Sequence, residues 1–106
     1  MNSIIEKKIS SVFDTKPSNF SRLEISIECP LDSGVRATGK WVGNESSIHA
    51  QFGGVKDFFL YITEYRKNNP NHLFNRILIT AENSKIIDIS FSFDEILHAK
   101  TMENIQ

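Results

Sequence analysis

Cys29 and His49 are the two residues of this chain that a thiol enzyme would use as nucleophile and base. The alternation of their strands separates them. Cys29 continues the inward positions of Leu23, Ile25 and Ile27, whereas His49 takes an outward position on another strand. A buried free cysteine behaves as a small apolar residue. We therefore predict that Cys29 belongs to the core and has no catalytic role.

The three histidines do not have the spacing of metal ligands. A zinc site typically takes ligands at short intervals, such as histidines at i and i+4. His49, His72 and His98 lie far apart and show no such pair. We interpret all three as surface residues and expect neither a metal nor another cofactor.

The closest carboxylates also have a structural explanation. A glycosidase needs two carboxylates at a defined separation in a cleft. Asp94 and Glu95 are better explained as the start of a helix, where acidic groups favour the positive end of the dipole. Glu24 and Glu28 have cross-strand partners, described next. Neither group of carboxylates therefore indicates a catalytic pair.

A hairpin organises these residues. Residues 22–29 and 35–42 both alternate, and Pro-Leu-Asp-Ser-Gly at 30–34 is typical of a turn. Placing Cys29 opposite Val35 sets Glu28 against Arg36, Ser26 against Thr38 and Glu24 against Lys40. Opposite charges across an antiparallel pair stabilise it. The pattern predicts an antiparallel sheet with one apolar face and one charged face, which also carries Arg22.

The remaining pattern predicts a single α+β domain over 1–106, with a mostly antiparallel five-stranded sheet and helices packed on one face. The strands are expected at 21–29, 35–43, 46–52, 76–81 and 86–93. A helix is expected at 3–13, a second from Val55 to a stop at Asn68-Asn69-Pro70-Asn71, and a short one from Glu95 to about Met102, capped by Asp94. The expected inward residues are Ile48, Ala50 and Phe52 in the third strand, Val55, Phe58, Phe59, Ile62 and Tyr65 in the second helix, Ile87, Ile89, Phe91 and Phe93 in the last strand, and Ile96, Leu97 and Met102 in the short helix.

Two glycine-rich positions are interpreted structurally. Gly53-Gly54 precedes a helix but lacks the spacing of a phosphate-binding loop, which favours a tight corner with unusual backbone angles. Trp41 lies between Gly39 and Gly43, whose small size leaves room for the indole ring in the core.

Composition and charge narrow the function classes. The chain has 106 residues, a net charge of −1, 40% apolar and 24% charged residues, so we expect a soluble globular protein that does not bind nucleic acid directly. The single cysteine excludes an intrachain disulfide and fits a reducing compartment. The N-terminus is charged too early for a secretory signal, and no apolar run has the ~20 residues of a membrane helix. We expect a cytoplasmic protein without direct membrane contact.

The order of these elements resembles the YezG-type bacterial immunity proteins, the antitoxins of polymorphic toxin and contact-dependent growth inhibition systems. The resemblance rests on residues 20–25 (Phe-Ser-Arg-Leu-Glu-Ile), the 58–62 helix segment (Phe-Phe-Leu-Tyr-Ile), and the strands at 77–80 and 86–94, the last of which ends in Phe93-Asp94. One difference is Phe20, which stands where such proteins often carry a tryptophan.

The resemblance implies a binding protein rather than an enzyme, and with it a partner and a contact surface. The partner would be the C-terminal toxin domain of a large secreted or surface protein, often a nuclease. Because such domains are often basic, carboxylates would meet them. The first candidate toxin-binding set is Glu24, Glu28, Asp32, Glu45 and His49, and the second is Glu82, Asp88, Asp94 and Glu95.

Two other function classes stay open at this level. A small-ligand-binding or enzymatic domain would need a pocket between the sheet and the second helix, near Trp41, Tyr61 and Tyr65. An oligomerisation domain would instead associate through an exposed strand edge. The sequence does not predict the strand order or the oligomeric state.

Overall fold

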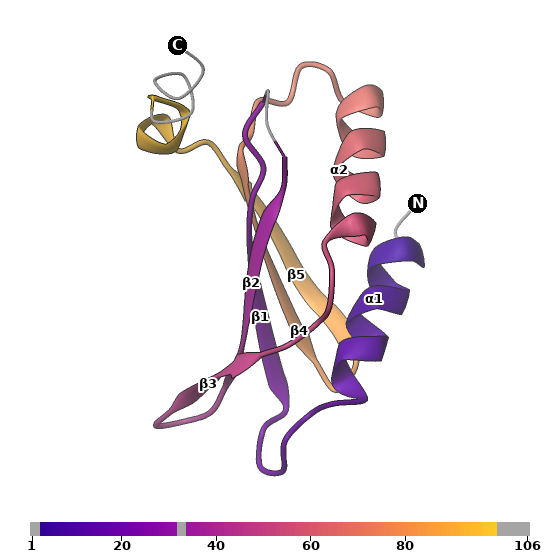
Figure 1. Cartoon of the computed structure of the whole chain (residues 1–106), viewed down its shortest axis with the longest axis vertical. Helices are drawn as coiled ribbons and strands as arrows, with labels where there is room; N and C mark the ends of the chain where they lie inside the picture. Colours follow the sequence, from indigo (N-terminus) through magenta and orange to yellow (C-terminus); the bar gives the residue numbers. More distant parts are fainter. Residues whose placement is uncertain (1–2, 32–33, 100–106) are drawn as a thin grey trace.

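A computed structural model describes residues 3–31 and 34–99 of the chain (Figure 1). Two main helices and five strands follow in the expected order, and a short helix covers residues 95–99. The elements are α1 (Ser3–Phe13), β1 (Arg22–Glu28), β2 (Arg36–Val42), β3 (Ser47–Ala50), α2 (Lys56–Asn68), β4 (Arg76–Glu82) and β5 (Lys85–Ser92).

The five strands form one antiparallel sheet in the order β3-β2-β1-β4-β5. The expected α+β class is confirmed. The sheet is not a simple meander, because the chain crosses through α2 after β3 and returns with β4 on the free side of β1. β1 is therefore the central strand, hydrogen-bonded to β2 and to β4.

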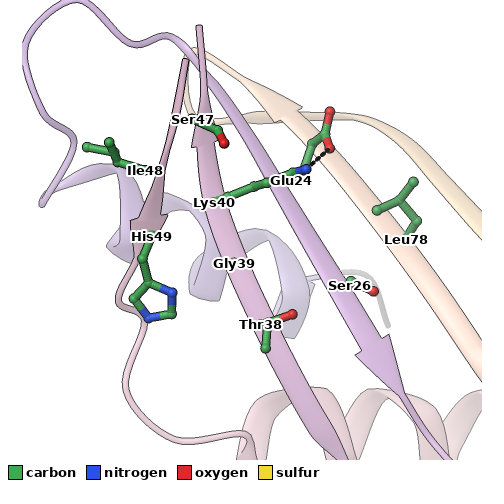
Figure 2. A pocket seen from close by; sticks show the side chains of 9 residues that line it. All are labelled: Glu24, Ser26, Thr38, Gly39, Lys40, Ser47, Ile48, His49 and Leu78. Carbon is green, nitrogen blue, oxygen red and sulfur yellow. Dashed lines mark ion pairs between the residues drawn. The ribbon is translucent and has the colours of Figure 1, made fainter.

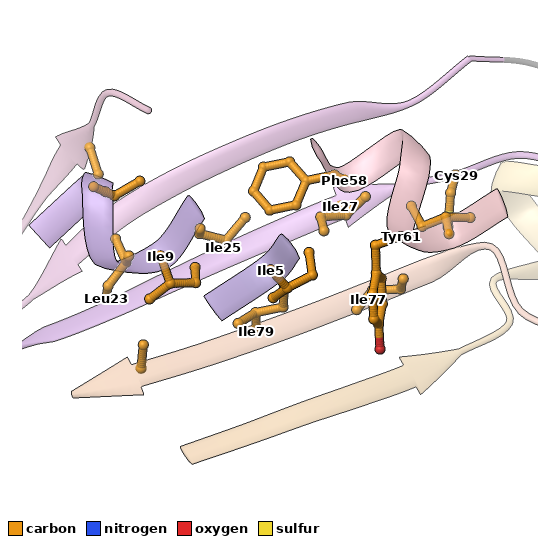
Figure 3. Close-up of a cluster of buried hydrophobic side chains, with 14 of the residues drawn as sticks. Ile5, Ile9, Leu23, Ile25, Ile27, Cys29, Phe58, Tyr61, Ile77 and Ile79 are labelled. Carbon is orange, nitrogen blue, oxygen red and sulfur yellow. The ribbon is translucent and has the colours of Figure 1, made fainter. Parts of the chain in front are cut away.

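Both long helices cover the same face of the sheet, and the apolar side chains between the layers form the core (Figures 1 and 3). The inward positions of β1 are fully buried, and Cys29 at the end of the strand is buried with them. Trp41 is 2% exposed and lies edge-on to Phe13, with ring centroids 5.0 Å apart. The helix residues of this core are Ile5, Ile9, Val12, Phe13, Phe58, Tyr61 and Ile62.

The register of the hairpin agrees with the sequence prediction. Glu24 lies opposite Lys40, Ser26 opposite Thr38 and Glu28 opposite Arg36. The inward side of the same pair places Leu23 against Trp41 and Ile25 against Gly39. A shift of one residue would move every apolar side chain to the other face, so the burial pattern and the register specify each other.

The corner before α2 also agrees, since Gly53 adopts φ +73°, a conformation that side chains rarely take. β3 is shorter than expected and ends at Ala50. Phe52 leaves the strand and packs over Gly39, where a Cβ atom would lie 2.9 Å from the Phe52 ring. The missing side chain at Gly39 therefore allows this aromatic ring to close the edge of the core, edge-on to Phe58.

Several expected core positions are wrong. In α2, Phe59 is 49% exposed and Tyr61 is buried in its place, because the inward stripe runs through 58, 61, 62 and 65. Ile48 is exposed on the edge strand. Ile96 is the most exposed of the large apolar residues described, although Leu97 is half-buried as expected. Met102 lies outside the described residues.

The last strand differs because of a bulge. The pairing of β4 with β5 shifts between Thr80 and Ala81, so that Thr80 lies opposite Asp88 and Ala81 opposite Ile86. Ile87 is the extra residue and is half exposed, whereas Ile86 packs against the core. A strict alternation counted back from Phe91 and Ile89 puts Ile87 on the inward face, so the sequence prediction for Ile87 is wrong. Phe93 lies beyond the strand and is half-buried, with its ring near His98.

Candidate functional site

The face of the sheet opposite α1 and α2 is the candidate functional surface. In Figure 1 the two long helices lie on one side of the strands, and the short helix of residues 95–99 lies at one end, away from them. We call the outward side chains of the strands the open face. Its residues are Arg22, Glu24, Ser26, Glu28, Arg36, Thr38, Lys40, Val42, Ser47, His49, Arg76, Leu78, Thr80, Glu82, Lys85, Asp88, Ser90 and Ser92.

The strand register arranges the open face in four rows that cross the sheet. Each row is given from β5 towards β3. The first row is Lys85, Glu82, Arg22, Val42 and Ser47, and the second is Asp88, Thr80, Glu24, Lys40 and His49. The third row is Ser90, Leu78, Ser26 and Thr38, and the fourth is Ser92, Arg76, Glu28 and Arg36. Five of these side chains are basic and four are acidic. The open face is therefore a surface of mixed charge, with one uncharged row between charged ones.

Ion pairs within the sheet already use two of the carboxylates. Lys40 Nζ lies 3.8 Å from Glu24 Oε1, as the dashed line in Figure 2 shows. Glu28 lies opposite Arg36 on β2 and opposite Arg76 on β4, and its Oε1 lies 3.7 Å from Arg76 Nη1. Side chains this exposed gain little stability from such pairs.

A shallow hollow of about 450 Å³ lies over β1 and β2 on this face (Figure 2). Leu78 from β4 and Ile48 from β3 supply apolar contact, and both are more than 40% exposed. The hydroxyl groups of Ser26 and Thr38 and the Glu24–Lys40 pair supply hydrogen-bonding groups. The hollow therefore has exposed apolar side chains next to polar groups whose positions the strand register sets. Protein-binding surfaces typically combine apolar and polar groups in this way.

The first candidate set is only partly brought together. Glu24, Glu28 and His49 belong to the open face, but Glu24 and Glu28 lie in the second and fourth rows. Glu45 is exposed in the turn between β2 and β3. Asp32 lies outside the described residues. The set is therefore spread along the sheet rather than gathered in one patch.

The second candidate set divides in a similar way. Glu82 and Asp88 lie on the open face in neighbouring rows, and Glu95 is exposed on the short helix. Asp94 has a structural role. Its Oδ1 accepts from the backbone N–H of Ile96 (2.9 Å) and of Leu97 (3.1 Å), as expected for a helix cap, and its Oδ2 accepts from Arg76 Nε at 2.8 Å. The Leu97 amide and then the Arg76 guanidinium lower the pKa of Asp94.

Asn75 is a structural residue that the sequence pattern did not indicate. It is 1% exposed, donates from Nδ2 to the carbonyl oxygen of Asp94 and accepts at Oδ1 from the Asp94 N–H. Its own N–H donates to Ser92 O, and its carbonyl accepts from Cys29 N–H. The only available signal was its position directly before a strand, which does not identify a partner 19 residues away.

Aromatic rings occupy the region between α2 and the end of the sheet, around Tyr65, where a ligand-binding domain would need its pocket. Tyr65 stacks on Phe91 with ring centroids 4.6 Å apart and lies edge-on to Phe74. The Tyr65 hydroxyl lies 2.6 Å from Nδ1 of His72. Arg66 places its guanidinium over Phe74 and donates to the carbonyl oxygens of Cys29 and Phe74. These contacts pack the rings of the cluster directly against one another.

Cys29 is buried as predicted, and its burial raises the pKa of the thiol to about 11, although the nearby Arg66 lowers it somewhat. Among residues 3–31 and 34–99, no group of three or more His, Cys, Asp or Glu residues could hold a metal ion. No helix in that part of the chain is long and apolar enough to cross a membrane.

No family model matches the chain, and no curated protein matches it significantly.

Proposed function

We propose that this protein is an immunity protein, which binds a cognate bacterial toxin domain with its open face and blocks the active or substrate-binding surface of that toxin. The resemblance of the sequence pattern to YezG-type immunity proteins favours this class, and it favours a nuclease as the toxin. The observation that carries the proposal is the layering of the fold. One sheet face holds both long helices, while the other presents an exposed, chemically varied surface on a rigid support.

The centre of the proposed contact is Leu78. It is 41% exposed in the uncharged row, between Ser26 on β1 and Ser90 on β5. Apolar side chains surrounded by polar groups commonly supply the central contact of an interface, and the charged rim gives specificity. Glu24 and Glu28 would take part as members of ion pairs, so the partner must match both signs of charge.

The test begins with a toxin gene next to the gene for this protein. The encoded C-terminal domain, made as an inactive variant, is titrated with this protein by calorimetry, and the active domain is tested for growth arrest with and without it. Leu78→Asp is expected to weaken binding by about tenfold or more, because it places a charge in the central contact. Phe59→Asp is the matched control, since Phe59 is similarly exposed but lies on α2.

Two outcomes would contradict the proposal. One is a toxin domain that binds neither variant nor the natural protein and still arrests growth in its presence. The other is loss of binding in Phe59→Asp with no change in Leu78→Asp, which would place the contact on the helical face.

A further inference from the structure

The open face is complementary to itself, and we propose that a second copy of this chain covers it in a two-fold dimer. The sheets would pack face to face, with the rotation axis along the strands and midway between β1 and β4. This inference depends only on the register and charges of the open face. It stands whether or not the partner of the proposed function is a toxin.

The strand order determines which side chains would meet. The two-fold rotation places β1 of one copy on β4 of the other, and β2 on β5. In the second row, Asp88 then faces Lys40 of the second copy. In the first row Glu82 faces Arg22, and in the fourth row Arg76 faces Glu28. Every charged side chain of β1, β2, β4 and β5 meets either an opposite charge or an uncharged residue.

The uncharged row also fits this arrangement. Leu78 would lie on Ser26 of the second copy, and Ser90 on Thr38, so the small residues make room for the leucine on both sides of the axis. Twisted sheets pack face to face with their strands within about 30° of each other. A two-fold rotation about the strand direction preserves the twist, so the two surfaces follow the same curvature.

The other in-plane axis, which runs across the strands, is less favourable. It would pair Arg22 with Glu28 and Glu82 with Arg76, but it would place Asp88 on Ser90 and Lys40 on Thr38. Asp88 would then lack an opposite charge. The axis along the strands brings three different pairs of oppositely charged residues together, whereas the axis across the strands brings two. The orientation with the axis along the strands is therefore favoured.

Asp88 and Lys40 are the informative pair. They lie in the same row but on β5 and β2, three strand spacings apart, which is about 14 Å within one copy. They therefore cannot form an ion pair in the monomer. Asp88 has no ion pair within residues 3–31 and 34–99, and Lys40 is 55% exposed at its side chain. Any energetic coupling between these two residues reports a contact between copies.

The size of the surface predicts a weak dimer. Four strands of about seven residues give a footprint of about 19 by 23 Å, or roughly 440 Å² per copy, which is below the roughly 800 Å² per partner of a standard specific complex and in the range of weak ones. We expect a dissociation constant on the order of 100 µM, which rises with salt because opposite charges supply much of the specificity. A partner that binds the open face more tightly would displace the second copy.

The experiment is sedimentation velocity of the full chain from about 10 µM to 1 mM, chosen to span that dissociation constant. Asp88→Lys and Lys40→Asp are each expected to weaken the dimer by about tenfold or more. In either variant, residues 88 and 40 of opposite copies carry the same charge, and the two-fold axis repeats this contact twice in each dimer. An equimolar mixture of the two variants is expected to recover association, since each mixed dimer restores both contacts. Glu64→Lys on α2 makes the same charge change away from the open face and should leave association unchanged.

A second measurement covers the case in which a charge variant does not fold. Ser90→Cys and Thr38→Cys are mixed and treated with a short bismaleimide cross-linker, while Cys29 stays buried. The mixture should cross-link into dimers, and Ser90→Cys alone should not, because two copies of Ser90 do not face each other. A chain that is monomeric up to 1 mM would overturn the proposal. So would a dimer that neither the charge variants nor the cysteine pairing affects.

Discussion

Asn75 and Asp94 are joined by two hydrogen bonds that run in opposite directions. Asn75 Nδ2 donates to the carbonyl oxygen of Asp94 at 2.9 Å, and Asp94 N–H donates to Asn75 Oδ1 at 2.7 Å. The pair connects the start of β4 to the segment that follows β5. It also places the Asp94 carboxylate next to Arg76 and at the start of the short helix.

Replacement of Asn75 by Ala should lower the free energy of unfolding by about 2–3 kcal/mol. The variant removes both bonds to Asp94 and leaves two backbone groups in a half-buried place without their partner. Urea unfolding followed by circular dichroism measures the change. Asn71→Ala, in the exposed loop after α2, is the control and should change stability little. Equal stability of the two variants would show that the paired bonds contribute nothing.

The Asp94 carboxylate should contribute stability that depends on pH. Its pKa is lowered in the folded protein from an ordinary value of 3.8, so the unfolded chain binds the proton more readily. The contribution is then fully present above pH 3.8 and is lost as the pH falls through the lower pKa of the folded state. Asp94→Asn keeps a capping side chain but loses the charge that faces Arg76.

The measurement for Asp94 is urea unfolding of the natural chain and of Asp94→Asn at several pH values between 7 and about 2.5, which bracket the carboxylate range. The difference in stability should be constant above pH 5 and should shrink below pH 3.8. A difference that stays the same at the lowest pH would mean that the charge of Asp94 has no part in it.

Gly39→Ala should destabilise the fold by about 1–3 kcal/mol. The added Cβ would lie 2.9 Å from Cε1 of Phe52 and 3.1 Å from its Cδ1, so the ring must move away from Phe58. Gly34→Ala is a matched control because nothing lies within 4 Å of the added atom. Thermal unfolding compares the two variants, and an unchanged midpoint in Gly39→Ala would show that Phe52 does not need this position.

The Cys29 thiol should resist alkylation in the native protein. Burial raises its pKa from 9.0 to about 11, so almost no thiolate is present at pH 8 and reagents cannot reach the sulfur. Reaction with iodoacetamide should require global unfolding and become fast in about 6 M guanidinium chloride. That concentration unfolds proteins whose unfolding midpoint is below about 5 M, the value above which a protein is called hyperstable. Rapid labelling under native conditions would place the thiol at the surface.

The same shift predicts the response of stability to alkaline pH. The contribution of the neutral thiol is fully present below pH 9.0, the ordinary pKa, and is lost as the pH rises towards the folded pKa of about 11. Cys29→Ala removes this group, so its stability should fall less between pH 9 and 11 than that of the natural chain. An identical decline in both proteins would exclude the thiol as the cause.

Local patterns in the sequence were enough to predict the order of the helices and strands, the inward side of β1 and β2, and the pairing of Glu24 with Lys40. These features depend on neighbours along the chain: turn residues at 30–34, a period of two in strands and a period near 3.6 in helices. The helix cap at Asp94 and the corner at Gly53 were predictable for the same reason.

The strands that became neighbours after the crossover could not be predicted in this way, because long-range packing sets them. β4 returned beside β1 rather than beside β3, and this brought Arg76 to Glu28 and Asn75 to Asp94. Long-range packing also decided the bulge that exposes Ile87. Pairings between distant segments depend on how the two helices fill the space over the sheet, and local periodicity carries no information about that packing. For the same reason, the four rows of the open face could be read only once the strand order was known.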